Sequence, residues 1–383
     1  MHTTVRSEKG MALVMALGAI VIIGVLIGGI VFVSTQDTRI GSNTMRATRA
    51  AAAAELGLNR IRQDWNLADN NRMAVGDTLK KTYTAPRGAN VNVIITKVDG
   101  QFFWVVAEGT AGALGSQATA RRRYGALFRL DTPDIPFMGA LTGRGHVTVT
   151  GNATVSGKDS VPSGWTGCPP KKDIAGITAV DTSTAGIPAC TAGKTCVDGN
   201  PKYVQTPLAG DTATYFVYGN ATYQSLAATA NIVVPAGATL TGIGPVVASG
   251  VCSIAVSTNW GDQTRAAPAP AGKCESYYPI IHALGDVHIT TGQGQGILLV
   301  DGDFYITGNF IFTGAVIVRG SLKMTGTGNH ITGAVMAANI DVDDNSLLLG
   351  NSSIRYSSCA LDAVMDGTAY PKPVKQRAWV DVY

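Results

Sequence analysis

Residues 296–326 read GILLVDGDFYITGNFIFTGAVIVRGSLKMTG, a repeat that specifies the architecture of most of the chain. Glycine recurs at every sixth position, and the second and fourth residues after each glycine are apolar. These apolar residues are Leu298, Val300, Phe304, Ile306, Phe310, Phe312, Val316, Val318, Leu322 and Met324. Alternate residues of a strand point to one face, and glycine adopts the positive φ of a sharp bend at little cost. The pattern predicts short strands that point two side chains inward and bend at each glycine.

These six-residue motifs are grouped into a longer sequence repeat. GILLVDG begins at 296, GAVIVRG at 314 and GAVMAAN at 333, so related words return after 18 or 19 residues. A repeat of this length, with three faces per turn, is typical of a β-solenoid. Similar words begin at 142 (TGRGHVTVTGNATVSG) and at 230 (ANIVVPAGATLTGIGPVVASG). We therefore expect a solenoid over residues 137–356.

Three segments do not follow the repeat. Residues 157–213 and 251–277 are expected to be loops that protrude from the solenoid and are clamped by disulfides. Residues 357–383 are expected to cap the open end of the solenoid, which would otherwise expose unpaired backbone groups.

The six cysteines all follow residue 167, on the side of the chain expected to be exported, and an even number there favours disulfides. Proximity in sequence predicts one pair between Cys190 and Cys196 and another between Cys252 and Cys274, which leaves Cys168 for Cys359. The cysteines include no CxxC motif, and the five histidines show no ligand spacing with them, so no metal site and no cofactor are predicted.

The N-terminal part is of a different kind. Residues 11–33 carry no charge and as a helix would be about 35 Å long, enough to cross a bilayer. No proline occurs from Gln36 to Asn66, so one long helix is expected over 11–66. Gly24 and Gly28 lie on one face of it, where another helix could approach closely. Arg6 and Lys9 precede the apolar segment, which predicts a cytoplasmic N-terminus and an exported body.

Between the helix and the solenoid, residues 76–131 are expected to form an antiparallel β-meander. Phe102, Trp104 and Val106 supply one apolar face for it. Arg121 to Arg123 are interpreted as charges that keep an exposed strand edge soluble, with an anion site as the alternative. The fold class is thus mainly β, with one long N-terminal helix, a small antiparallel sheet and a parallel solenoid.

The N-terminus resembles that of PilX-type minor pilins of type IV pili. The resemblance rests on the leader EKG, the apolar segment after it, and the downstream word formed by Ala53, Ala54, Glu55, Leu56, Gly57 and Leu58. It implies a leader over 1–10, cleavage by a prepilin peptidase between Gly10 and Met11, methylation of the new N-terminus and packing of the helix in the core of a filament. The likeness to solenoid domains attached to such pilins further implies a right-handed parallel β-helix.

One position departs from this family. Most pilins carry a glutamate as the fifth residue after the cut, thought to neutralise the buried amino terminus of a neighbouring subunit, and here Met15 stands there. An unpaired charge in an apolar bundle is costly. The departure suggests a subunit at the filament tip or one present in few copies.

Enzymatic and nucleic-acid-binding roles are not expected. Only 15% of residues are charged, and the net charge of +4 is spread without a basic face. Candidate carboxylates for a cation or for acid–base chemistry do not fall at equivalent offsets in the repeat, so they are interpreted as solvated. They are Asp301, Asp303, Asp341, Asp343 and Asp344.

The sequence therefore predicts a structural minor pilin that supports pilus assembly and surface adhesion. Its expected partners are other pilins, the prepilin peptidase, the inner membrane before assembly and a surface or host ligand. We expect an inner-membrane location with a periplasmic body, followed by an extracellular pilus. The alternatives are a pseudopilin of a type II secretion system and a membrane-anchored β-helix protein that binds or degrades polysaccharide.

Overall fold

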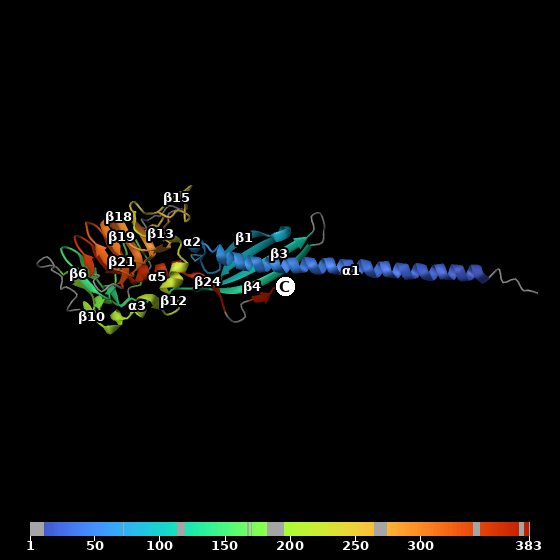
Figure 1. Cartoon of the computed structure of the whole chain (residues 1–383), viewed down its shortest axis with the longest axis horizontal. Helices are drawn as coiled ribbons and strands as arrows, with labels where there is room; N and C mark the ends of the chain where they lie inside the picture. The colour runs from blue at the N-terminus through green and yellow to red at the C-terminus, as the bar shows by residue number, and fades with distance from the viewer. Residues whose placement is uncertain are drawn as a thin grey trace, which may run out of the picture. The chain divides into compact units, whose positions relative to one another are not determined.

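The computed structural model describes residues 11–71, 73–112, 119–166, 168–169, 171–181, 195–263, 274–339, 345–374 and 379–382. The chain is mainly β with one long helix, as the sequence predicts (Figure 1). It divides into two compact units. Unit 1 comprises Met1–Asp64, Val75–Phe128 and Pro373–Tyr383, and unit 2 comprises Trp65–Ala74 and Arg129–Lys372.

Unit 1 packs the second half of a long helix against an antiparallel sheet. Helix α1 runs from Met11 to Gln63. The sheet has the strand order β1-β2-β3-β4-β24, and β25 also pairs with β4. The strands are β1 (Thr78–Ala85), β2 (Ala89–Lys97), β3 (Phe102–Gly112), β4 (Thr119–Asp131), β24 (Tyr370–Pro373) and β25 (Trp379–Asp381), and η1 (Pro86–Gly88) joins β1 to β2.

The meander buries the opposite face from the one predicted. Phe103, Val105 and Ala107 of β3 are fully buried, whereas Phe102, Trp104 and Val106 are only partly buried. Both sets are apolar, and a shift of one residue exchanges the two faces of a strand. The choice of Phe102, Trp104 and Val106 as the core face was therefore wrong.

Unit 2 contains a 15-stranded sheet whose strands all pair in parallel (Figure 1). Its strands are β5 (Gly139–Gly143), β6 (His146–Val149), β7 (Thr154–Ser156), β8 (Ala175–Ala179), β9 (Val197–Asp198), β10 (Tyr203–Gln205), β13 (Ile232–Val234), β14 (Ala238–Leu240), β17 (Ile280–Ala283), β18 (Val287–Val300), β19 (Phe304–Val318), β20 (Leu322–Met324), β21 (His330–Ala337), β22 (Asn345–Leu348) and β23 (Ser353–Tyr356). Two short hairpins, β11 (Val217–Tyr218) with β12 (Ala221–Thr222) and β15 (Val247–Ala248) with β16 (Val251–Cys252), lie outside it. The helices of the unit are α2 (Leu67–Asn70), η2 (Pro207–Gly210), α3 (Thr212–Phe216), α4 (Tyr223–Ala228), η3 (Cys274–Ser276) and α5 (Ser358–Thr368).

The glycine repeat sets the register of this sheet. Gly296 pairs with Gly314, and Gly314 pairs with Gly333, so the rungs are offset by one long repeat. A Cβ on Gly314 would lie 2.1 Å from the carbonyl O of Gly296, at a φ of +139° that other residues avoid, and a Cβ on Gly333 would lie 2.0 Å from the carbonyl O of Gly314. All ten residues predicted to point inward are buried in one hydrophobic core, which confirms that prediction.

The rungs do not stack in the order of the sequence. Along the main face the order is β10-β8-β5-β21-β19-β18-β17-β13. The chain enters in the middle at β5, advances through β8 to β10 at one end, restarts at the other end with β13, and returns to the middle at β21. There Val335 of β21 pairs in parallel with Leu141 of β5. Residues 206–231, with α3 and α4, connect the two ends of the stack, and we call them the crossover.

Two predictions for segments of unit 2 were wrong. The predicted loop 157–213 contains β8, β9 and β10, which extend the parallel sheet. The predicted cap 357–383 instead places α5 on a lateral face of β18, β19 and β21, where it joins a second core. The reason is that the first and third residues after each stacked glycine, such as Ile297 and Ile317, are also apolar and point outward, so this face requires a cover.

Candidate functional site

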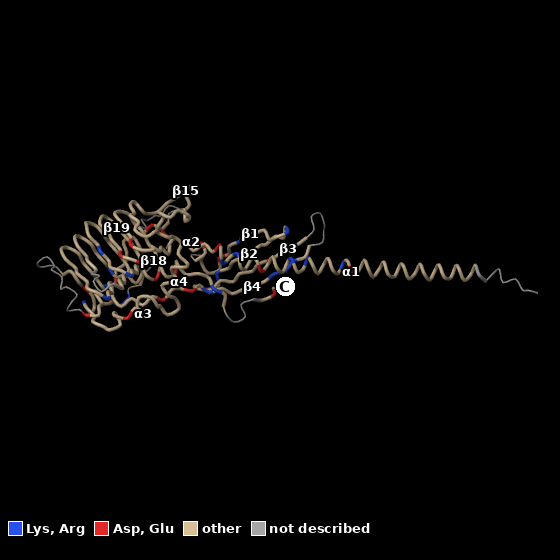
Figure 2. Tube along the Cα trace, viewed as in Figure 1, with Lys and Arg blue, Asp and Glu red and all other residues tan. Residues whose placement is uncertain are grey.

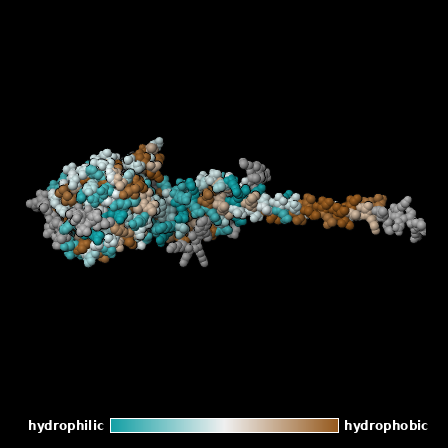
Figure 3. Space-filling model, viewed as in Figure 1, coloured by the Kyte–Doolittle hydropathy of each residue, from teal (hydrophilic) through white to brown (hydrophobic). Residues whose placement is uncertain are grey.

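The first half of α1 is an apolar surface that the rest of the chain does not cover. Its large side chains are 54–71% exposed, with Ile23 at the lower and Met15 at the upper limit. Figure 3 shows this stretch as one continuous hydrophobic segment, and Figure 2 shows no charge along it. By length and composition α1 is able to cross a membrane, a requirement that an N-terminal signal sequence also meets. Because each exposed Leu, Ile or Val side chain forgoes about 1.5–3 kcal/mol of burial, this surface needs lipid or protein around it.

The residues predicted to contact other helices lie on this uncovered surface. The Cβ position of Gly24 and that of Gly28 have no atom within 4 Å, so neither glycine is required by packing within the chain. Four residues apart, they share one face of the helix. Met11 is the first residue of α1. Gly10 lies outside the described residues, and the structure therefore does not test the predicted cleavage site.

The packing of the second half of α1 on the sheet accounts for the Ala-Ala-Glu-x-Gly-Leu motif. Ala53, Ala54 and Leu58 are buried against the sheet of unit 1, and Glu55 is exposed. A Cβ on Gly57 would lie 2.5 Å from Val91 Cγ1 of β2. On β3, a Cβ on Gly109 would lie 2.0 Å from the carbonyl O of Ala50. Small residues on both partners therefore let the helix approach the sheet very closely, and Leu58 and Ile61 fill the core beside them.

Asp301, one of the candidate carboxylates, belongs to a polar cluster that ties the crossover to the solenoid. It accepts a hydrogen bond from the hydroxyl of Tyr223 at 2.9 Å and lies 2.9 Å from Nε2 of His282. The guanidinium of Arg319 lies 3.7 Å away, and it also stacks over the ring of Phe216 at 5.6 Å. Burial, with the neighbouring carboxylate, raises the pKa of Tyr223 far above its usual value, so Tyr223 remains a hydrogen-bond donor.

Asp303, two residues on, is bound by a separate set of donors. The backbone N–H of Ser321 donates to Oδ1 at 2.8 Å, and the Tyr305 hydroxyl donates to Oδ2 at 2.7 Å. Lys323 lies 3.5 Å from Oδ2. Burial opposes ionisation, but these hydrogen bonds and the ammonium group hold the pKa of Asp303 below its usual value.

The candidate carboxylates do not converge on a cation site in the described part of the chain. Both oxygens of Asp301 and both of Asp303 already have partners within the protein. No group of three or more His, Cys, Asp or Glu residues among the described residues is arranged to hold a metal ion. Asp341, Asp343 and Asp344 lie outside the described residues.

No protein-family model and no curated protein matches the chain. A solved structure, that of the competence-associated pilin ComZ from Thermus thermophilus, is similar over 88% of this chain and 97% of its own. The identity is 12% and the TM-score is 0.22, values that do not establish a shared fold.

Among the described residues of unit 2, two disulfides join cysteines that were paired from sequence. Cys252 is joined to Cys274, and Cys168 is joined to Cys359. Cys190, the expected partner of Cys196, lies outside the described residues. The Cys168–Cys359 bond links the start of the stack to α5 across 191 residues of sequence.

Sequence reasoning did not find the partners of Asp301. Tyr223 and His282 lie 78 and 19 residues before it, and the hydrogen bonds depend on the crossover returning along the stack. The available signal was the run of Tyr215, Tyr218 and Tyr223 in a short polar segment, because large buried aromatic residues outside the repeat indicate a covering element.

Proposed function

We propose that the chain is a type IV pilin-like structural subunit whose α1 is stored in a bilayer and then packs among the helices of neighbouring subunits. The observation that carries this proposal is the contrast within one continuous helix. One face of the half after residue 49 is buried by its own sheet, whereas residues 13–33 are apolar on all sides and exposed. A helix that only anchored the protein would serve in the bilayer alone, but the free Gly24–Gly28 face favours a helical partner.

The finer assignment follows the resemblance of the N-terminus to PilX-type minor pilins. We propose cleavage between Gly10 and Met11, methylation of the new N-terminus at Met11, and incorporation at the filament tip or in few copies because Met15 offers no carboxylate. The body would be periplasmic before assembly and extracellular afterwards, where its surface supports adhesion. The role is structural and not enzymatic, which is supported by the engagement of Asp301 and Asp303 in hydrogen bonds within the chain.

Mass spectrometry of filaments sheared from cells tests the proposal directly. The expected result is this chain in the filament fraction, beginning at a methylated Met11. A chain that begins at Met1 and stays in the membrane fraction of cells that make filaments would contradict it. A chain with the processed N-terminus that is found only with a secretion system would instead indicate a pseudopilin.

A further inference from the structure

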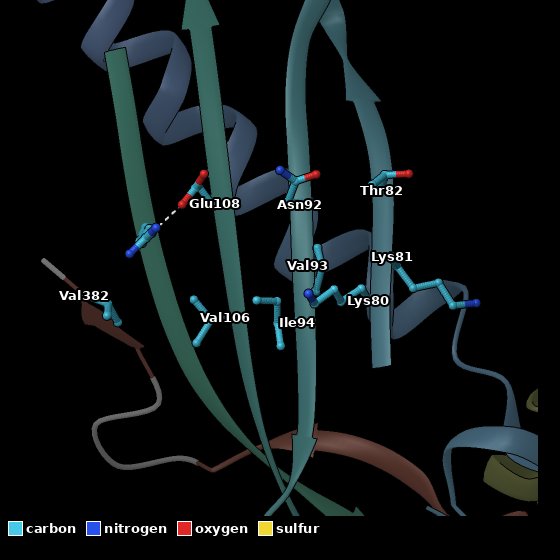
Figure 4. Close-up of a pocket in the computed structure, with 10 residues that line it drawn as sticks. Lys80, Lys81, Thr82, Asn92, Val93, Ile94, Val106, Glu108 and Val382 are labelled. Atoms are coloured by element: carbon cyan, nitrogen blue, oxygen red, sulfur yellow. Dashed lines mark hydrogen bonds and ion pairs between the residues drawn. The ribbon is translucent and has the colours of Figure 1, made fainter. Parts of the chain in front are cut away.

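We infer that the outer face of the sheet in unit 1 is a docking surface for an extended acidic segment of a partner protein, with an apolar residue at its centre. This inference concerns a surface on the side of the sheet away from α1 and does not depend on how α1 is used. Figure 4 shows the side chains that form it, which we call the outer groove. The outer groove is lined by Lys80, Ile94, Val106, Glu108, Arg123 and Val382, among others.

The floor of the outer groove is apolar although it faces solvent. Strand register places Lys80 beside Ile94 and Ile94 beside Val106, in one row across three strands. Ile94 is 38% exposed on a central strand, where an outward polar residue is the usual choice. With Val382, these side chains border a hollow of 510 Å³, large enough to receive a side chain. An exposed apolar hollow ringed by charge is characteristic of an interaction site.

Lys80 ends the row on β1, and further cations lie beside Glu108, two residues along β3 from Val106. Lys80 lies on β1, the edge strand, and makes no ion pair among the described residues. At the other side, Glu108 is shared by Arg121 at 3.3 Å and by Arg123, so two guanidinium groups meet one carboxylate. A second hollow, lined by Arg121, Arg122, Arg123, Asp381 and Val382, adjoins the first through Arg123 and Val382. Figure 2 shows Lys and Arg positions on the strands of this sheet.

The charge of this face favours an acidic partner. Around the two hollows Lys80, Lys81, Arg121, Arg122 and Arg123 outnumber Glu108 and Asp381, which leaves an excess of three positive charges where the whole chain carries only +4. Positive potential over a surface attracts carboxylates, and bidentate arginine recognition gives such contacts direction. The apolar floor between the cations distinguishes a polypeptide from a polyanion such as nucleic acid, which has no apolar side chain to place there.

The spacing defines the segment that fits. Measured across the strands alone, Lys80 on β1 and Arg123 on β4 are three inter-strand steps apart, which corresponds to about 14 Å. An extended chain rises about 3.3–3.4 Å per residue, so four steps of it span this distance. Because alternate residues of an extended chain point the same way, the first, third and fifth residues would face the groove. The predicted motif is acidic-x-apolar-x-acidic.

Two peptides of identical composition test this motif. GGDTITDGG places isoleucine on the same side as both aspartates, and GGDITTDGG turns it to the other side. Their binding to the full chain in neutral detergent micelles is measured by fluorescence anisotropy with labelled peptides. We expect the first peptide to bind at least about fivefold more tightly, a difference of about 1 kcal/mol.

Variants of the chain locate the binding. We expect Lys80→Glu and Ile94→Ser each to weaken binding of GGDTITDGG by at least about fivefold. The matched controls are Lys172→Glu and Val233→Ser, which change an exposed lysine and an exposed strand valine of unit 2 and should leave binding within about twofold. The proposal is overturned if neither peptide binds, if both bind equally, or if Ile94→Ser has no effect. It is also overturned if a 20-base-pair DNA or a vesicle containing phosphatidylglycerol binds more tightly than the peptide and depends on Lys80 alone.

Discussion

Removal of the Cys168–Cys359 disulfide is predicted to destabilise unit 2 more than removal of Cys252–Cys274. The first bond joins residues 191 apart in sequence and the second joins residues 22 apart. A crosslink stabilises the fold by restricting the unfolded chain, and the effect grows with the logarithm of loop length. Taking the separations as loop lengths gives about 5 kcal/mol for the first bond and about 3 kcal/mol for the second.

The long-range bond lies where the two halves of the stack meet. Close to it, Asp159 accepts hydrogen bonds from the backbone N–H and the hydroxyl of Ser358, both at 2.8 Å. Lys171 and Asp362 form an ion pair at 2.6 Å. These contacts remain when the disulfide is removed, so the folded junction should persist while its resistance to unfolding falls.

Thermal unfolding of the full chain in neutral detergent, followed by near-UV circular dichroism without reductant, measures the difference. For a unit of about 250 residues, 1 kcal/mol corresponds to about 2–4 °C in Tm. Cys168→Ser with Cys359→Ser should lower Tm by about 10–20 °C, and Cys252→Ser with Cys274→Ser by about 6–12 °C. An equal or smaller drop in Tm for the first pair would contradict this prediction, because the strands β5, β8 and β10 would then unfold independently of the rest.

Three further predictions concern α1 and Asp303. Gly57→Ala should destabilise the helix–sheet contact of unit 1 by about 1–3 kcal/mol, whereas Gly41→Ala, on the exposed part of α1 where a Cβ meets nothing, should stabilise the helix by about 1 kcal/mol. Hydrogen exchange along α1 reports both, and effects of the same sign would contradict the packing argument. Asp303→Asn should cost about 1–3 kcal/mol at pH 7. Because the pKa of Asp303 is lowered in the folded protein, its ionised form stabilises the fold above about pH 4. The difference in free energy of unfolding between Asp303→Asn and the unchanged protein should therefore shrink at lower pH. A difference that does not depend on pH would count against this. Met15→Glu should alter the amount of the chain in sheared filaments, and an unchanged amount would remove the reason for placing it at the tip.

Much of the solenoid was predictable because its information is local. The glycine spacing specifies where the chain bends, and alternation specifies that Leu298 and Val300 point inward, as they do. The order of the rungs was not predictable in the same way. All rungs present similar apolar pairs to the core, so β21 satisfies the same pattern beside β5 as it would at the end of the stack. The long connection 206–231 was the available sign of a return, because adjacent rungs require only a short turn.

In the sheet of unit 1, too, the sequence pattern allowed two arrangements and did not choose between them. Alternation along β3 defined two apolar faces, and the sequence of the strand alone did not decide between Phe103 and Trp104 for the core. The decision comes from Gly109, which lies on the same face as Phe103 and must admit the backbone of α1 at Ala50. Glycine within a strand often marks such a close approach, and here Gly109 lies on the buried face of β3.

In α1, the residues that are explained by folding are different from the residues that bear on function. Ala53, Ala54, Gly57 and Leu58 are explained by contact with the sheet of unit 1, so any protein that packs a helix this closely would select similar residues. That word therefore supports a helix-on-sheet fold without specifying a filament. Residues 13–33 have no partner of this kind within the described chain, and their uniform apolarity requires an environment outside it. The functional assignment thus depends on the uncovered half of α1, and identifying what surrounds that half in the cell decides between a lipid anchor and a filament core.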